Sequence, residues 1–351
     1  MGNGETLIEF IREHLRTMPL VTTPSQVRGR TFIVTGANSG IGFEVAKHLV
    51  RMDAAKVILA VRNVVAGKEA LAKINNTTTI GYTTAATSTT SEPTAIKNAV
   101  AEVWALDLVS YDSVKAFASR AAKELDRLDG LVENASIALD RFSLAEGMET
   151  SVTVNVFSTF LLAVLLLPKM TETAKKFSTM PHLTLVTSGL GFMRKEQLED
   201  IKDDVWGNLA DENTEMDSRY GLTKLIQIYA LRQLASLFPV SQTQVAINMI
   251  SPGLCKTGLI RHAKLSTYLI ITGMTYVLGR SAEEGSRTVL HAVFAGEESH
   301  GLMLSYCKIV DSTFVPDWVG DPEGQAMQKL IWKGVAERLE AIAPGCKERI
   351  L

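Results

Sequence analysis

A tyrosine and a lysine stand one helical turn apart in the segment YGLTK, residues 220–224. A phenol titrates near pH ~10, so it is almost never ionised at neutral pH. A positive charge beside it favours the phenolate and lowers the pKa. Because Tyr220 and Lys224 share a helix face as i and i+4, they could form a tuned proton donor. Taken alone, such a pair is more often two residues on a solvated helix face.

A glycine-rich segment, TGANSGIG (35–42), follows an apolar β-branched run and opens a helical pattern. Glycine allows a tight turn and lets backbone N–H groups approach a phosphate, and the following helix N-terminus attracts negative charge. This strand–loop–helix context predicts a dinucleotide site rather than a tight turn alone. The residues expected to bind the cofactor here are Gly36, Asn38, Ser39, Gly40, Ile41 and Gly42.

The end of the second apolar run indicates which nicotinamide cofactor is used. An acidic residue there would accept hydrogen bonds from the ribose hydroxyls, whereas an arginine would meet the extra phosphate of NADP. The sequence has AVRN, with Arg62 and Asn63 and no acid. We therefore predict NADP(H) as the cofactor, bound in part by Arg62 and Asn63. The alternative is that Arg62 is a solvated charge at a strand end.

Strand-like and helix-like segments alternate along most of the chain. The strand-like runs are apolar along their length, which is typical of parallel strands buried on both faces. We predict an α/β fold: a single doubly wound Rossmann-type domain with a parallel seven-stranded sheet and helices on both faces. The predicted strands are 31–36, 56–62, 101–108, 129–135, 182–188, 244–251 and 301–310.

No linker divides the chain into two large domains. We predict a catalytic domain over residues 30–315, preceded by a helical extension (1–29) and followed by a helical tail (316–351). A Thr- and Ser-rich stretch at 75–95 is typical of a surface insertion. The segment 259–280, after the sixth predicted strand, is strongly apolar, which would suit contact with a lipophilic molecule. A buried helix pair, a dimer contact or a lid resting on a membrane are alternatives.

Composition excludes several classes of function. The chain has 351 residues and a net charge of −2, so no strong field favours nucleic acid. Its three cysteines and six histidines show no disulfide framework or metal-ligand spacing, which favours a reducing, cytoplasmic setting. The longest apolar run, 160–168, is too short to span a bilayer, so no membrane span is expected. The first residues do not match the pattern of a secretory leader, so none is expected; they fit the loose pattern for Gly2 myristoylation, or a surface helix.

Six motifs follow one another along the chain: TGANSGIG, ALDL (105–108), ENAS (133–136), VTS (186–188), YGLTK and SPGLCKTG (251–258). In residues and in order they resemble the short-chain dehydrogenase/reductase family. The resemblance covers about residues 28–310 and is nearest to retinol-dehydrogenase-like members and to fungal enzymes of secondary metabolism. It implies a Rossmann-type fold, a nicotinamide cofactor, redox chemistry at a carbonyl and a substrate lid at 259–280.

The resemblance implies four catalytic residues. Tyr220 would be the general acid and base, and Lys224 would lower its pKa and hold the nicotinamide ribose. Ser188 would bond the substrate oxygen, and Asn155 would hold a water in a proton relay. Ser188 could instead be a capping hydroxyl, and Asn155 an amide satisfied within the core.

The same resemblance implies further contacts with the cofactor. One member, Asp107, could instead be the N-cap of the following helix. The expected residues are Asp107 and Leu108 near the adenine, Asn134 and Ala135 along the ribose, and Pro252, Gly253 and Thr257 beside the nicotinamide, with Tyr220 and Lys224.

Two features depart from the family pattern. The Asn-Asn-Ala-Gly motif becomes ENAS, so Glu133 and Ser136 replace asparagine and glycine, and Ser136 adds a side chain where the backbone would run close to the cofactor. The interval between Ser188 and Tyr220 is also long, and its acidic stretch is expected to form a rim of the active site. Neither departure removes a catalytic group.

The sequence and the resemblance thus predict an NADP-dependent oxidoreductase that interconverts a ketone and a secondary alcohol on a lipophilic small molecule, in the biosynthesis of a secondary metabolite such as a polyketide or terpenoid. By analogy with relatives, the helices that carry Asn155 and Tyr220 would form a homodimer surface. A cyclase, isomerase or dehydratase on the same fold is the first alternative. A non-catalytic cofactor-binding protein is the second.

Overall fold

The computed structural model describes residues 12–14, 16–78, 100–259, 273, 275–276 and 278–346. Several predicted segments fall wholly or largely outside these residues. They are the N-terminal helix and the Gly2 site, most of the 75–95 insertion, most of the 259–280 lid and the last residues of the tail.

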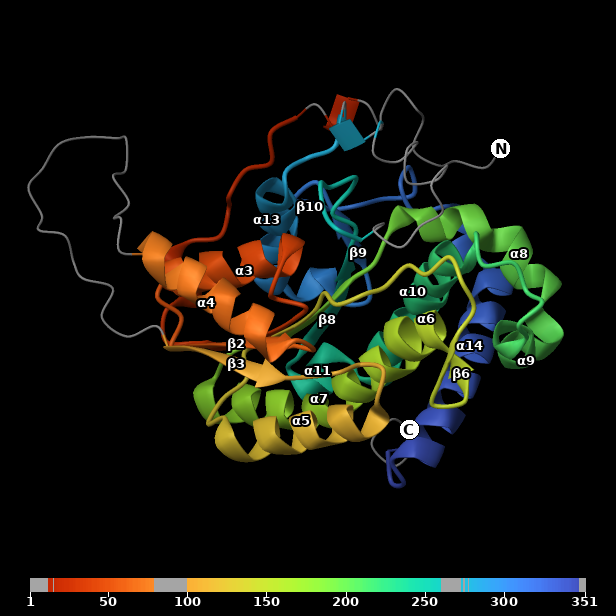
Figure 1. Cartoon of the computed structure of the whole chain (residues 1–351), viewed down its shortest axis with the longest axis horizontal. Helices are drawn as coiled ribbons and strands as arrows, with labels where there is room; N and C mark the ends of the chain where they lie inside the picture. The colour runs from red at the N-terminus through yellow and green to blue at the C-terminus, as the bar shows by residue number, and fades with distance from the viewer. Residues whose placement is uncertain are drawn as a thin grey trace, which may run out of the picture.

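An eight-stranded sheet forms the centre of the described chain (Figure 1). Its order is β10-β9-β8-β7-β4-β1-β2-β3, and the neighbours from β3 to β9 are parallel. The order reverses between β1 and β4, the kind of switch point where doubly wound sheets bind ligands beyond their strand ends. The strands are β1 (Thr31–Thr35), β2 (Lys56–Val61), β3 (Val100–Ala105), β4 (Gly130–Glu133), β7 (His182–Val186), β8 (Ala246–Ile250), β9 (Met303–Ser305) and β10 (Lys308–Ile309).

The Rossmann-type α/β prediction is confirmed, with one difference in the sheet. The segment predicted as a single strand over 301–310 is a hairpin, in which β10 pairs antiparallel to β9. Tyr306 and Cys307 between them have φ of 53° and 56°, the left-handed conformation of a tight hairpin turn. This turn reverses the chain and adds an eighth, antiparallel strand to the seven parallel ones.

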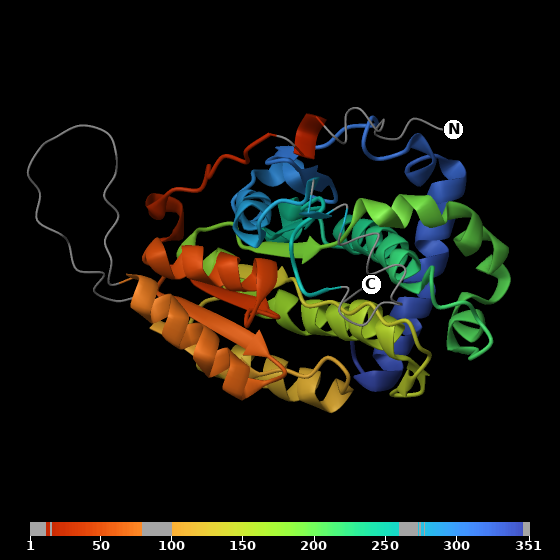
Figure 2. The ribbon, with the colours of Figure 1, turned by 45° about the horizontal axis from the view of Figure 1, so that its top comes forward.

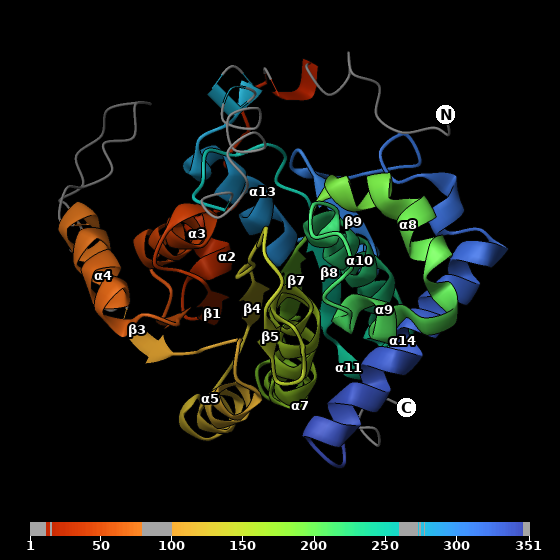
Figure 3. The same cartoon turned by 45° about the vertical axis from the view of Figure 1, so that its right-hand side comes forward.

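Helices cover both faces of the sheet (Figures 2 and 3). On one face, α3 (Gly40–Arg51), α4 (Val64–Thr78) and α13 (Ala282–Val293) share a core with Phe32 and Val34 of β1. On the other face, α5 (Tyr111–Glu124), α7 (Thr159–Phe177) and α10 (Arg219–Leu237) share a core with Ile33. Successive residues of β1 therefore enter opposite cores, which explains why the inner strands of the sheet are mostly apolar.

Shorter elements connect these layers. Helix α4 continues to Thr78, so the predicted insertion begins later than residue 75. The remaining elements are α2 (Pro24–Val27), β5 (Leu144–Ala145), β6 (Met148–Glu149), α6 (Thr150–Val152), the π-helix η1 (Thr153–Ser158), η2 (Gly189–Arg194), α8 (Lys195–Asp200), η3 (Lys202–Asp204), α9 (Val205–Ala210), α11 (Val240–Thr243), η4 (Glu297–Ser299), η5 (Asp317–Val319) and α14 (Pro322–Ile342).

Helix α14 packs along α10 and the start of α7, as Figures 1 and 3 show. The Trp332 ring lies 6.0 Å from the Phe160 ring, and Gln328 donates to Gln233 of α10 at 2.8 Å. Helices α8 and α9, from the long interval before Tyr220, lie beside them. The surface of α10 that was expected to meet a second subunit is thus covered in part by the chain's own tail.

A continuous helical stretch, Thr150–Phe177, passes through α6, η1 and α7. It is longer than the apolar run noted in the sequence, and its length and composition would allow it to cross a membrane. However, 89% of its most apolar window is buried inside the molecule. It is therefore the central helix of the core on that face of the sheet.

Candidate active site

The glycine loop lies against the loop that follows β4. Gly36 has φ of 66°, and a Cβ there would meet Ala135 Cα at 3.2 Å. A Cβ on Gly42 would lie 2.5 Å from Asn134 Nδ2 and 2.9 Å from the Gly36 carbonyl oxygen, both too close for a side chain without a shift of these neighbours. These two glycines are therefore required so that the first helix and the β4 loop can approach each other closely.

Thr35 joins the same two loops from the end of β1. Its hydroxyl accepts hydrogen bonds from the backbone N–H groups of Asn134 and Ala135, both at 2.9 Å. Asn134 in turn donates from Nδ2 to the Thr35 carbonyl at 2.8 Å. Thr257 also lies here, because a Cβ on Gly40 would contact its methyl group at 3.5 Å. The glycine loop, the loop after β4 and Thr257 thus meet at the start of α3, and the sequence reasoning did not name Thr35. Their contact with a cofactor stays a prediction.

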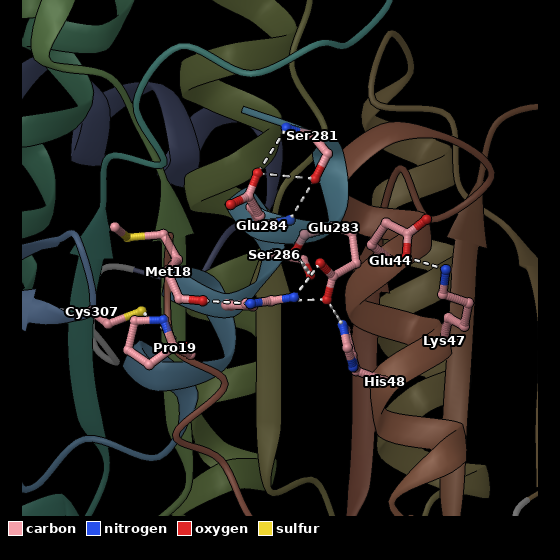
Figure 4. Close-up of polar contacts among 11 residues, drawn as sticks. Met18, Pro19, Glu44, Lys47, His48, Ser281, Glu283, Glu284, Ser286 and Cys307 are labelled. Carbon is pink, nitrogen blue, oxygen red and sulfur yellow. Dashed lines mark hydrogen bonds and ion pairs between the residues drawn. The ribbon is translucent and has the colours of Figure 1, made fainter. Parts of the chain in front are cut away.

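Polar contacts hold α3 against α13 at the other end of the helix (Figure 4). His48 of α3 bonds Glu283 at 2.9 Å, and Arg287 binds the same carboxylate at 2.7 and 3.0 Å. Arg287 also donates to the Met18 carbonyl at 2.5 Å. Burial lowers the pKa of His48, while Glu283 opposes that shift. The helix that follows the glycine loop is therefore fixed to α13 and to the N-terminal segment.

The predicted adenine-side residues are partly engaged in local structure. Arg62 is exposed just after β2, whereas the Asn63 side chain accepts from the Ala66 N–H and caps α4. Asp107 accepts from the Val109 N–H at 3.0 Å within a turn. Ser110, not Asp107, is the N-cap of α5.

Leu108 is buried at the start of the same turn. Its backbone carbonyl accepts a hydrogen bond from Ser158 of η1 at 2.6 Å. The turn after β3 is thereby attached to the π-helix that carries Asn155.

Tyr220 and Lys224 lie on one face of α10, as their spacing predicts. The Lys224 ammonium is 5.4 Å from the centre of the Tyr220 ring, and Lys224 is 1% exposed. The residue before the pair, Arg219, is also buried; it donates to the Leu209 carbonyl and lies 3.8 Å from the buried Glu149 carboxylate. This anchors the start of α10 to the neighbouring elements α6 and α9.

Asn155 is fully buried in the π-helix η1, and both ends of its amide are satisfied. Its Oδ1 accepts from the Ile137 N–H at 2.9 Å and from the Ser136 hydroxyl at 3.1 Å. Its Nδ2 donates to the Ile137 carbonyl at 2.9 Å and to the Thr223 hydroxyl at 3.1 Å. Asn155 therefore joins the β4 loop to α10 between Tyr220 and Lys224.

The backbone carbonyl of Asn155 reaches Lys224 through a residue that the sequence reasoning missed. Gln227 donates from Nε2 to this carbonyl and accepts from Lys224 Nζ at 3.0 Å. Lys224 also donates to the Val186 carbonyl at 3.1 Å. The only sequence signal was a polar residue about one turn after Lys224, within the apolar run 225–228.

The electrostatics of the pair differ from the expectation that Lys224 lowers the pKa of Tyr220. Burial raises the pKa of Tyr220, and a hydrogen bond with the Ser136 hydroxyl acts in the opposite direction. Burial also lowers the pKa of Lys224 to about 7, so its positive charge is only partly present at neutral pH. For both groups the cost of burying the charged form is the largest cause of the shift in pKa.

Ser188 and the loop after β8 lie near the ends of the next strands. The Ser188 hydroxyl accepts from the Leu190 N–H at 3.3 Å and is the N-cap of η2. The following Gly189 N–H bonds the Ser251 hydroxyl at 3.2 Å. Pro252 is buried beside Ser251, and Gly253 has φ of 75°. The capping alternative for Ser188 is thus observed, and its proposed contact with a substrate stays a prediction.

Comparison with known proteins gives the same family as the motifs. The family model described as short chain dehydrogenase matches residues 30–109 and 82–198. The short chain dehydrogenase/reductase dmxR8 from the fungus Cryptosporiopsis sp. (strain 8999) is 38% identical over 321 residues, covering 90% of this chain and 92% of that protein.

Solved structures agree with the fold. A 3-ketoacyl-(acyl-carrier-protein) reductase from Brucella melitensis, complexed with NADH, has a TM-score of 0.55 and 18% identity, covering 80% of this chain and 97% of that one. A short chain dehydrogenase from Escherichia coli CFT073, complexed with NADPH, has a TM-score of 0.54 and 19% identity, covering 81% and 99%. The chain described here belongs to the short-chain dehydrogenase/reductase family.

Proposed function

We propose that this protein is an NADP(H)-dependent oxidoreductase that interconverts a ketone and a secondary alcohol, with Tyr220 as the general acid and base. The observation that carries the proposal is the half-buried Tyr220 ring beside the buried Lys224 ammonium, which is linked through Gln227 to Asn155. A phenol beside an ammonium that buried hydrogen bonds hold in place is suited to proton transfer.

The residues present fit a nicotinamide dinucleotide. Gly36 and Gly42 allow a close approach of loops at the start of α3, and Ser39, the N-cap of that helix, makes no side-chain capping bond. The N–H groups of this first turn suit a pyrophosphate. Arg62, exposed after β2 with no acid beside it, supports NADP(H) over NAD(H).

The protein's own residues would handle the proton. Bound NADPH would supply a hydride to a carbonyl carbon, and NADP would accept one in the reverse direction. Burial keeps the Tyr220 phenol protonated, so it can donate to the carbonyl oxygen as negative charge develops there. Lys224, protonated in part at neutral pH, stabilises the phenolate left behind, and the Ser188 hydroxyl would bond the same substrate oxygen.

We further propose a lipophilic substrate in fungal secondary metabolism and a cytoplasmic setting. The apolar composition of 259–280 and the similarity to a fungal relative support the substrate class. Three scattered cysteines and a net charge of −2 fit a reducing compartment without nucleic-acid partners. Because α14 covers part of α10, a homodimer would need a surface other than that part of α10.

The proposal is tested with purified protein, NADPH and NADH, and a panel of lipophilic ketones, with NADP and alcohols for the reverse reaction. We expect faster turnover with NADPH and a product heavier by two hydrogens. Product of unchanged mass would indicate a cyclase or isomerase, and loss of water a dehydratase. No turnover with any ketone or alcohol would leave only cofactor binding.

Tyr220→Phe is expected to bind NADPH normally but to lose about 10²- to 10⁴-fold in turnover, since it lacks the transferable proton. Tyr229→Phe is the matched control, because Tyr229 is a buried phenol on the same helix outside the proposed site. Unchanged turnover in the Tyr220 variant would disprove the assignment.

A further inference from the structure

The N-terminal segment, residues 12–14 and 16–19, precedes the part of the chain that resembles the family, yet it contacts the loop after β8. His14 is 6% exposed, and its Nε2 accepts a hydrogen bond from the Leu254 N–H at 2.9 Å. Because a ring nitrogen that accepts carries no proton, the imidazole is the neutral tautomer with its proton on Nδ1. His14 thus holds a backbone group 240 positions later in the chain.

The imidazole lies directly against Gly253, the residue before Leu254. A Cβ on Gly253 would lie 2.8 Å from His14 Nε2 and 2.9 Å from Arg280 Nη1, closer than such atoms ordinarily approach. Gly253 also has φ of 75°, in the left-handed region that favours glycine. The backbone of the loop is therefore enclosed by the imidazole and the guanidinium.

Arg280 ties the same loop to the N-terminal segment. Its backbone N–H donates to the Leu254 carbonyl at 2.9 Å, and its guanidinium donates to the Glu13 carbonyl. The guanidinium lies 5.0 Å from the centre of the Tyr306 ring, and the His14 ring meets Tyr306 edge-on at 5.9 Å. The peptide groups of Leu254 are thus held on both sides, the N–H by His14 and the carbonyl by Arg280.

Other contacts fix the N-terminal segment in place (Figure 4). Arg287 of α13 donates to the Met18 carbonyl, and the Cys307 thiol donates to the Pro19 carbonyl at 3.6 Å. Met18 is 2% exposed. Because these anchors do not involve His14, a substitution of His14 should remove its hydrogen bond to the loop without releasing the segment.

We propose that His14 is a positioning residue for the cofactor: by accepting from Leu254, it holds the loop that begins at Pro252 in the conformation that binds the nicotinamide end. This inference rests on the proposed function, in which Pro252, Gly253 and Thr257 border the nicotinamide. It gives the N-terminal extension a part in the site that the sequence did not indicate. What the site needs from this position is a hydrogen-bond acceptor at a fixed place.

Loss of the acceptor should weaken cofactor binding. Without a partner for the Leu254 N–H, the cofactor-free loop is less strongly held in the conformation that binds the cofactor. The apparent Kd then rises in inverse proportion to the fraction of protein in that conformation. One hydrogen bond corresponds to a change of about 3- to 10-fold.

The test measures the NADPH affinity of full-length variants by fluorescence, and hydrogen exchange of the 252–256 backbone in the cofactor-free protein. His14→Phe keeps a ring beside Tyr306 but accepts no hydrogen bond. We expect it to raise the Kd for NADPH by about 3- to 10-fold and to speed exchange of the Leu254 N–H. His14→Gln retains an acceptor, and its Kd should stay within about twofold of wild type.

His300→Phe is the matched control, because His300 Nδ1 accepts from the Ile247 N–H at 3.1 Å near the other end of β8. It loses the same kind of hydrogen bond, so urea unfolding should show a similar loss of stability, but its Kd for NADPH should equal that of wild type. If His14→Phe does not fold, His14→Ala takes its place.

Three results would overturn the inference: an unchanged Kd in His14→Phe, an equal rise in His300→Phe, or an equal rise in His14→Gln. The proposed function fails by a different result, which is full turnover in Tyr220→Phe.

Discussion

Two ionisable side chains are buried at the ends of the neighbouring strands β4 and β7, and their surroundings differ. Lys224 donates to the carbonyl of Val186, the last residue of β7, and to the amide oxygen of Gln227. Glu133, the last residue of β4, is 2% exposed, and neither carboxyl oxygen has a partner within the described chain. The Lys224 ammonium is hydrogen-bonded to neutral oxygens, whereas the Glu133 carboxyl has no hydrogen-bond partner within the described chain.

Burial moves both pKa values toward the neutral form, but with different consequences. The pKa of Lys224 falls to about 7, so the ammonium and the amine both exist at neutral pH. The pKa of Glu133 is raised well above its usual range by burial, so the carboxyl tends to keep its proton. Lys224 can thus gain or lose its proton near neutral pH, whereas the Glu133 carboxyl stays neutral there.

The two groups also give opposite dependences of stability on pH. An unfolded lysine keeps its proton up to about pH 10.5, while folded Lys224 releases it above about 7, so its contribution to stability rises between these values. An unfolded glutamate loses its proton near 4.5, while folded Glu133 retains it. Its contribution is therefore fully present below pH 4.5 and declines as the pH rises above that value.

The largest expected effect comes from Lys224→Met. Turnover should fall by about 10²- to 10⁴-fold, since no ammonium remains to stabilise the phenolate. The wild-type gain in unfolding free energy between pH 7 and 10.5, on the order of 5 kcal/mol from the pKa shift, should disappear. Steady-state kinetics and urea unfolding at a series of pH values measure the two effects.

Lys169→Met controls for the loss of a helical lysine. Lys169 is also largely buried, but its ammonium pairs with the exposed Glu172 at 3.1 Å. It should keep wild-type turnover and the wild-type rise in stability above pH 7. If Lys224→Met kept that rise, the gain could not come from the buried ammonium.

Periodicity and motif order predicted the architecture well, because apolar β-branched runs and helical spacing are local signals. The parallel sheet, the glycine loop and the placement of Tyr220 beside Lys224 follow from such signals. The hairpin at Tyr306 and Cys307 does not, because nothing in SYCK demands two left-handed residues. The packing of α14 on α10 also depends on contacts between distant segments.

The next largest effect is expected at Gln227, because Lys224 has this hydrogen-bond partner whereas the Glu133 carboxyl has none within the described chain. Gln227→Met removes one acceptor of the ammonium and the donor to the Asn155 carbonyl, which should cost about 1–3 kcal/mol of unfolding free energy. The pKa of Lys224 should fall further, because burial is then opposed by one partner fewer. The window in which stability rises with pH should therefore begin below pH 7.

Gln233→Met is the matched control for this change. Gln233 is a half-buried glutamine on the same helix, and its amide oxygen accepts from Gln328 of α14. It should lose about 1 kcal/mol or less and keep the wild-type turnover and pH window. An unchanged window in Gln227→Met would mean that Val186 alone determines the state of Lys224.

The site was less predictable than the fold, and Gln227 and Ser136 show why. Motif positions located Asn155, Tyr220 and Lys224, because a resemblance transfers residue by residue. Gln227, which connects Lys224 to Asn155, lies outside the matched motifs. Ser136, which donates to Asn155, replaces the glycine of its motif. Their contacts arise only when the π-helix η1 brings Asn155 between the β4 loop and α10.

The smallest of the expected effects is that of Glu133→Gln on the unfolding free energy at acidic pH. At or below pH 4.5 both side chains are neutral and of similar size, so the unfolding free energy should change by less than about 1.5 kcal/mol. As the pH rises, the unfolded wild type gains a carboxylate that the fold disfavours, whereas the variant does not. The variant should therefore become more stable relative to wild type as the pH rises.

Urea unfolding of both proteins across this range measures the difference. A constant difference from acidic to alkaline pH would mean that Glu133 ionises in the fold as readily as in water, and the contrast with Lys224 would be lost.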